Sequence, residues 1–165
     1  MPEEKLVLTA HLFRRAGIGV TREDLDYYAD EEYESLVEDL LHPERFPDLE
    51  DDILARYYPH LGTDGGAIGS AAGRWIYRML NTKRPLQEKM ALFWHHVFAT
   101  GWYKGEHSPS SVTQIETFRN NGLGKLRDIL LDLSRDPAMI FWLDNRENHN
   151  DSINENYGRE LLELF

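Results

Sequence analysis

The chain of 165 residues carries 29 acidic and 18 basic side chains, which gives a formal net charge of −11, and it contains no cysteine. A field of this sign repels phosphate backbones and anionic membrane surfaces, so nucleic acid is not an expected partner. The lack of cysteine excludes disulfide scaffolds, thiol catalysis and cysteine-ligated metal centres. With 41% hydrophobic residues, the chain can fill the core of one ordinary domain.

The N-terminal stretch MPEEKLVLTAHLFRRAG lacks the charged-then-apolar pattern of a secretory signal. The apolar runs elsewhere are only a few residues long, which is too short for a transmembrane segment. We therefore expect a soluble chain, cytoplasmic by default.

Apolar residues in the first half of the chain recur mainly at helical spacing. The first helix is expected to end at Gly17, and Thr21 is expected to cap the second. A third helix should end at His42-Pro43, because proline disfavours helical backbone in the residue before it. We also expect a short acidic helix over 48–58 and, over 60–73, a loop that leads into a helix.

Residues that typically start or stop helices also divide the second half of the chain into predicted helices. Pro85 suits the first position of a helix that ends at Gly101, and a polar loop should follow. Further helices are expected after Ser110 or Ser111, over 125–136, after Asp136, and after Asn154 or Asn156. No segment alternates as a strand does, so the sequence predicts an all-α, irregular bundle of about seven to nine helices without a significant β-sheet.

The last expected helix, GRELLELF, reaches Phe165 with its apolar face still running and with no stop signal. We therefore predict that residues 1–165 form a single helical domain. We also predict that they are the N-terminal portion of a longer domain, cut within this helix.

Two adjacent histidines, His95 and His96, stand in the apolar run FWHHVFAT. At about 100° per residue, Glu88 and His95 fall on almost one line of the helix, whereas His96 is rotated toward a flank. A carboxylate and an imidazole placed in this way can share a metal ion. The spacing matches neither HExxH nor the ExxH of di-iron bundles, and the aromatic neighbours favour a packed structural histidine.

A second group of charged side chains lies in NENYGRELLELF. Glu155 stands near the helix start, and Glu160 and Glu163 are neighbours at i, i+3. Brought near His95 by folding, these carboxylates would make a site for a divalent metal. The alternative is a solvated charge cluster in which Arg159 neutralises a neighbouring glutamate.

Two arginines, Arg14 and Arg15, stand out in this acidic chain. One of them could pair with a buried carboxylate such as Asp144 or Glu160 and fix one helix against another. Other candidates for such a pair are Arg78 and Arg119. A serine nucleophile is not expected, because no GxSxG motif is present.

Four segments together resemble a known family: HLFRRAGIG (11–19), RPLQEKMALFWHHVFATG (84–101), GLGKLRDILLDLSRDPAMIFWLDN (122–145) and NENYGRELLELF (154–165). Their order is similar to that in the bacterial domain-of-unknown-function family DUF1800. The resemblance implies a domain of a larger, often exported protein whose sequence continues past ELLELF. It also singles out His95, whereas Val97 stands where the family often has a second histidine. It implies no assigned activity.

Two functional hypotheses follow. The first is a structural or interaction module that binds a protein partner or the remainder of its own chain, because no complete catalytic motif is present. The alternative is a metal-dependent hydrolase or oxidoreductase, with His95, Glu88 and Glu160 as catalytic candidates. Its metal ligands would come from His95, Glu88, Glu155, Glu160 and Glu163.

Overall fold

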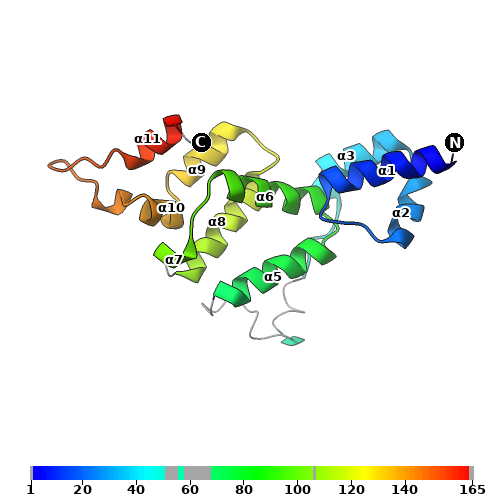
Figure 1. Cartoon of the computed structure of the whole chain (residues 1–165), viewed down its shortest axis with the longest axis horizontal. Helices are drawn as coiled ribbons and strands as arrows, with labels where there is room; N and C mark the ends of the chain where they lie inside the picture. Colours follow the sequence, from blue (N-terminus) through cyan, green and yellow to red (C-terminus); the bar gives the residue numbers. More distant parts are fainter. Residues whose placement is uncertain (1, 51–55, 58–67, 106, 164–165) are drawn as a thin grey trace.

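The computed structural model describes residues 2–50, 56–57, 68–105 and 107–163, and these residues form an all-α fold (Figure 1). Ten α-helices occur in the described ranges, eight of them with seven or more residues, and no strand is present there. The predicted fold class is confirmed. The helices are α1 (Pro2–Ala16), α2 (Arg22–Ala29), α3 (Tyr33–Leu41), α5 (Ile68–Asn81), α6 (Pro85–Val97), α7 (Trp102–Gly105), α8 (Ser108–Asn121), α9 (Leu126–Leu133), α10 (Pro137–Trp142) and α11 (Asn156–Glu163).

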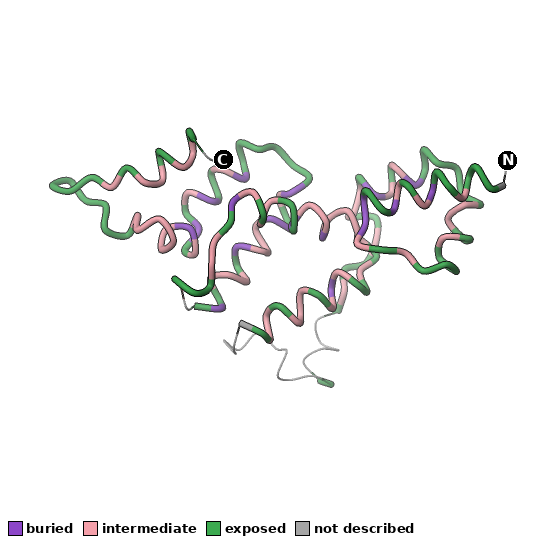
Figure 2. Tube along the Cα trace, viewed as in Figure 1, coloured by how far each residue is buried: buried purple, intermediate pink, exposed green. Residues whose placement is uncertain are grey.

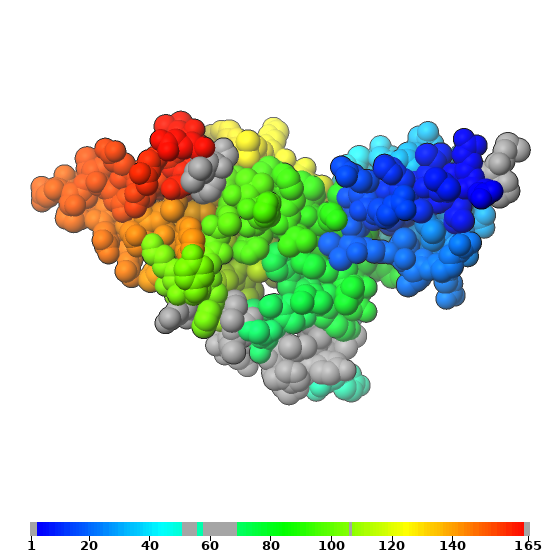
Figure 3. Space-filling model, in the orientation of Figure 1, coloured from blue at the N-terminus to red at the C-terminus, as the bar shows by residue number. Residues whose placement is uncertain are grey.

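The molecule is elongated, and its helices follow the long axis roughly in chain order (Figures 1 and 3). The N-terminal helices α1, α2 and α3 lie at one end, and α9, α10 and α11 lie at the other. The central helices α6 and α8 form the most extensive helix–helix contact, and α5 packs against both of them. These two central helices carry four of the polar side chains described below, namely Glu88, His95, Gln114 and Arg119.

In the described ranges, buried apolar side chains form two clusters, which lie along different parts of the long axis (Figure 2). The central cluster joins α6, α8, α9 and α10, and it includes Phe98 and Phe118, both almost fully buried. The N-terminal cluster joins α1 and α3 through Phe13, Leu36 and Leu40, and Leu86 of α6 packs against it. One helix, α6, thus contributes to both clusters.

Local signals in the sequence account for several helix starts. The Thr21 hydroxyl accepts a hydrogen bond from the backbone N–H of Asp24 at 3.1 Å, which caps α2 as predicted. Pro85 is the first residue of α6, where its missing N–H costs no hydrogen bond. Asp136 caps α10 through a hydrogen bond from the backbone N–H of Met139 at 2.8 Å.

Two boundaries differ from the sequence prediction. The helix α6 ends at Val97 rather than near Gly101, because Phe98 leaves helical geometry and buries its ring in the central cluster. The predicted polar loop contains the short helix α7, and α8 begins at Ser108 with His107 as its cap. Most of segment 48–58, which is predicted to be a helix, lies outside the described residues. The predicted loop at the start of segment 60–73 also lies outside them.

Candidate functional site

The helix α6 presents Glu88 and His95 on one face, as the helical phase predicts. Trp75 of α5 contacts both side chains, and its indole N–H donates a hydrogen bond to Glu88 Oε2 at 2.9 Å. The same indole ring meets the His95 ring edge-on, with 5.5 Å between ring centroids. In contrast, His96 is exposed. The two adjacent histidines are therefore in different environments.

The carboxylate of Glu88 is the centre of a buried ionic cluster, which we call the Glu88 cluster: Glu88, Trp75, Arg78 and Arg119. Glu88 is only 1% exposed, and Arg78 and Arg119 are 5% and 4% exposed. Arg119 donates to both carboxylate oxygens, from Nε to Oε1 at 2.6 Å and from Nη2 to Oε2 at 3.2 Å. Arg78 Nε donates to Oε1 at 3.4 Å. A buried carboxylate needs this kind of pairing, because an isolated buried charge is very costly.

Each arginine of the Glu88 cluster also reaches a more exposed carboxylate. Arg119 Nη1 lies 2.6 Å from Glu116 Oε1, one turn earlier on α8. Burial disfavours the charged guanidinium, but Glu88 and Glu116 outweigh it and raise the pKa of Arg119. Arg78 Nη2 donates to Asp48 Oδ1 at 2.6 Å. The cluster therefore extends from the core to the surface on two sides.

The electrostatics of Asp48 agree with this pairing. Partial burial by itself would raise the pKa of the Asp48 carboxyl, but the backbone N–H of Leu49 and the charges of Arg78 and Arg84 lower it overall. Asp48 precedes α5 in the chain, and it is joined to Arg78 of that helix across 30 positions. This contact ties the segment after α3 to the core.

His95 lies beside the Glu88 cluster in an apolar setting. Its ring lies between Trp75 and Phe118, with a centroid separation of 6.4 Å to the latter. Burial lowers the pKa of His95, and the nearby Gln114 side chain opposes that shift only in part. The Nδ1 atom is buried and has no hydrogen-bond partner among the described residues. The imidazole is therefore held in its neutral form at neutral pH.

A second buried polar group lies next to His95 and is centred on Gln114. The Gln114 amide donates to Asp136 Oδ1 at 2.9 Å, and its oxygen accepts from the Thr100 hydroxyl at 2.7 Å. Burial raises the pKa of Asp136, although hydrogen bonds from the Met139 backbone and from Gln114 oppose the change. This chain of hydrogen bonds connects the segment after α6, the middle of α8 and the start of α10.

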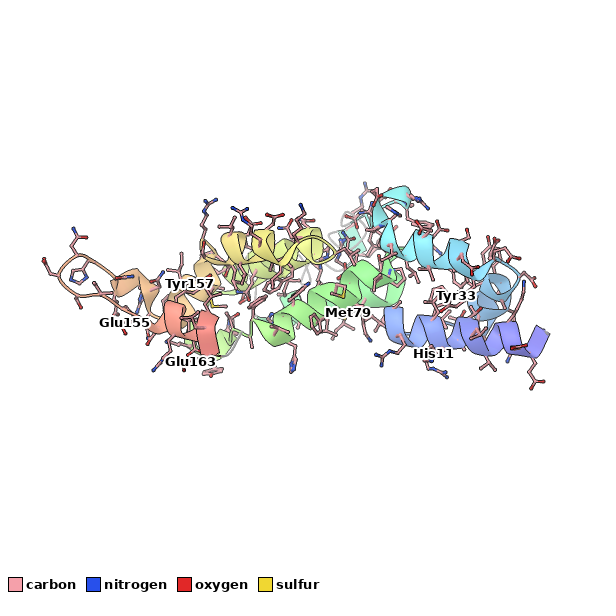
Figure 4. The ribbon with its side chains drawn as sticks, turned by 90° about the horizontal axis from the view of Figure 1, so that it is seen from above. His11, Tyr33, Met79, Glu155, Tyr157 and Glu163 are labelled. Carbon is pink, nitrogen blue, oxygen red and sulfur yellow. The ribbon has the colours of Figure 1, made fainter. Side chains whose placement is uncertain are left out.

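The predicted carboxylates of the last helix lie elsewhere. Glu155 and Glu163 are exposed, and they lie toward the end of the molecule opposite to His11 and Tyr33 (Figure 4). Glu160 is half-buried. Across the described ranges, no group of three or more His, Asp or Glu side chains is arranged to hold a metal ion. The candidate ligands His95, Glu88, Glu155, Glu160 and Glu163 therefore form no such group among the described residues.

The predicted pairing of Arg14 or Arg15 with a buried carboxylate is wrong. Both arginines are exposed on α1. Of the carboxylates proposed for them, Asp144 is bound by Lys104, whose Nζ donates to its Oδ2 at 2.9 Å. The buried pairing is made by the two other predicted candidates, Arg78 and Arg119, which lie on helices that flank Glu88.

Trp75 and Gln114 are among the members of the site that the sequence did not single out. Gln114 lies one turn before the buried Phe118 on α8 and is itself fully buried. A polar residue at i−4 from an apolar core position was the signal that could have revealed it. Trp75 offered no such signal, because a tryptophan in a helix is ordinarily read as core.

The structure thus defines an all-α protein with a buried Arg–Glu–Arg cluster at its centre. Comparison with protein families identifies the chain more narrowly: the model of DUF1800, a protein family of unknown function, matches residues 11–165, so the chain belongs to this family. No curated protein and no solved structure matches the chain. None of the described helices is long and apolar enough to cross a membrane.

Proposed function

We propose that this chain is a structural and interaction module of a larger protein. The observation that supports it most is the state of Glu88, whose two carboxylate oxygens accept four hydrogen bonds from Trp75, Arg78 and Arg119. A carboxylate engaged in this way fixes α5, α6 and α8 against one another and has no lone pair directed at a ligand. Its role is to specify how three helices pack.

Exposed apolar side chains support the interaction part of the proposal. Ile76 and Leu80 are 56% and 71% exposed, and they lie one turn apart on α5. Leu162 of α11 is 87% exposed. Single exposed apolar residues are common, but two neighbours on one helix face form a small patch that a partner or another part of the polypeptide can cover.

The substitution Glu88→Gln in the intact protein tests the structural role. It removes the charge that both arginines need, so we expect a clearly lower melting temperature with an unchanged metal content after purification without chelator. Glu34→Gln, at an exposed position on α3, is the matched control and should leave the melting temperature unchanged. A bound metal that Glu88→Gln removes without any loss of stability would contradict the proposal.

The alternative is the metal-dependent enzyme, and one observation favours it. The buried Nδ1 of His95 has no hydrogen-bond partner in the described part of the chain, and the imidazole is neutral, which is the form that binds metals. Elemental analysis of the intact protein, compared with its His95→Gln and His96→Gln variants, tests this function. Stoichiometric metal that is lost only in His95→Gln would support it, and equal metal content in all three would reject it.

A further inference from the structure

A cavity of about 480 Å³ lies between the N-terminal helices and the connection from α5 to α6. Its lining comes from α1, α2, α3, the turn after α3, and residues 83–85. This volume falls within the range of small-molecule sites, which is about 300–1,000 Å³. The cavity is separate from the Glu88 cluster, since none of the four residues of that cluster lines it.

Aromatic and aliphatic side chains form most of the cavity wall. The rings of Phe13 and Tyr28 are stacked with 4.5 Å between centroids, and Tyr27 meets Tyr28 edge-on at 5.5 Å. Leu36 and Phe46 add further apolar surface. The wall therefore provides a platform for an apolar or aromatic group of a ligand.

Four charged side chains line the same cavity, and two of them are already engaged. Asp39 accepts a hydrogen bond from Arg45 at 3.2 Å. Arg84 donates to the Phe46 carbonyl oxygen from Nε at 2.9 Å and from Nη2 at 2.6 Å. Arg84 Nη1 also lies 3.8 Å from Asp48 Oδ2, so both Asp39 and Arg84 already have a charged partner outside the cavity wall.

The other two charges, Glu31 and Lys83, are different. In the part of the chain that the structure describes, neither side chain forms a hydrogen bond or an ion pair. The cavity thus offers one unpaired carboxylate and one unpaired ammonium beside an aromatic wall. A purely cationic ligand would leave Lys83 unpaired, and a purely anionic ligand would leave Glu31 unpaired.

From this charge pattern, we propose that the cavity binds a small zwitterion with an apolar body, which is the chemistry of a short apolar peptide with free termini. The ligand ammonium pairs with Glu31 and its carboxylate pairs with Lys83. Its apolar side chains pack against Tyr28 and the neighbouring aromatic rings. The Ser35 hydroxyl, which also lines the cavity, provides a further hydrogen-bonding group. This binding function is independent of the structural role of Glu88.

The test uses one dipeptide, phenylalanyl-leucine, in four forms: free, N-acetylated, C-amidated and capped at both ends. Binding to the intact protein is measured by titration calorimetry. Because an ion pair near the surface contributes little, we expect each single cap to weaken binding by about two- to fivefold and the double cap to weaken it most. Failure of the free dipeptide to bind, or equal binding of the free and doubly capped forms, would overturn the proposal.

Two variants assign each charge to its residue. In Glu31→Gln, N-acetylation should no longer weaken binding, while C-amidation should still do so. In Lys83→Met the pattern should be reversed. Glu34→Gln on α3 is an exposed control that does not line the cavity and should bind all four forms as the natural protein does. Unchanged cap effects in both cavity variants would reject the assignment.

Discussion

The Nε atom of Arg119 donates to Oε1 of Glu88 across 2.6 Å, and the two residues are separated by 31 positions in the chain. Both side chains are almost fully buried. A buried ion pair of this kind contributes little net stability compared with a well-packed apolar pair, because desolvation offsets the attraction. Loss of one partner strongly destabilises the fold, because it leaves a buried charge without compensation.

The first prediction concerns that loss. Arg119→Met keeps much of the side-chain volume but leaves Glu88 with Arg78 and Trp75 alone. We expect a loss of about 3–5 kcal/mol in the free energy of unfolding, measured by urea denaturation. Arg127→Met is the control, because Arg127 is exposed and should change stability by less than about 0.5 kcal/mol. Equal effects of the two substitutions would show that the Glu88 cluster is not a structural element.

A second prediction follows from the environment of His95. Its pKa is lower in the folded protein than in the unfolded chain, so the unfolded state binds the proton first as the pH falls. The stability that the neutral ring contributes is therefore present above the unfolded pKa, near 6.5, and is lost as the pH falls toward the folded pKa. We expect His95→Gln to reduce the slope of stability against pH over this window by at most about 1.4 kcal/mol per pH unit.

The control for the pH measurement is the adjacent His96→Gln. Because His96 is exposed, this variant removes an imidazole from the adjacent position without disturbing the buried contacts of His95. Denaturant titrations at several pH values between neutrality and mild acid make the comparison. Parallel profiles for the natural protein and His95→Gln would contradict the assignment of a neutral buried ring.

The third prediction concerns Gly122 at the end of α8. A Cβ atom at this position would collide with the Phe118 carbonyl oxygen and would lie 3.1 Å from Cδ1 of Trp94. The Trp94 indole also donates to the Gly122 carbonyl oxygen at 2.8 Å, so the backbone there has little room to move. We expect Gly122→Ala to destabilise the protein by about 1–3 kcal/mol in thermal unfolding.

A matched substitution at Gly158 should have the opposite sign. This glycine lies within α11, and a Cβ atom there would meet nothing within 4 Å. Gly158→Ala is therefore expected to increase stability by up to about 1 kcal/mol, which is the helix propensity difference between the two residues. A stabilising effect of Gly122→Ala would show that the end of α8 is less tightly packed than the contacts indicate.

Sequence reasoning succeeded where the signal was local. Thr21, Pro85 and Asp136 occupy the helix starts that they predict, since caps and proline act within one turn. The common face of Glu88 and His95 was also predictable, because it depends only on the helical period. These signals require no knowledge of how the helices pack.

The partners of Glu88 could not be chosen in the same way. Arg78 and Arg119 lie 10 and 31 positions from Glu88 in the chain. The sequence contains many other basic residues, and nothing in their spacing distinguishes these two as the partners of Glu88. The end of α6 was misplaced for a related reason: burial of Phe98 in the central cluster overrides the helical signal of the residues that follow. Tertiary packing decides both features.

The position of α6 in both apolar clusters has a consequence for how the molecule opens. Leu86 packs against the N-terminal cluster and Ala91 belongs to the central one, only five positions further along the same helix. Local unfolding of α1 to α3 therefore frees the first turn of α6 while the rest of the helix stays anchored by α8. In native-state hydrogen exchange, the amides of α6 should accordingly divide into an early-exchanging N-terminal group and a late-exchanging remainder, with the boundary near Glu88.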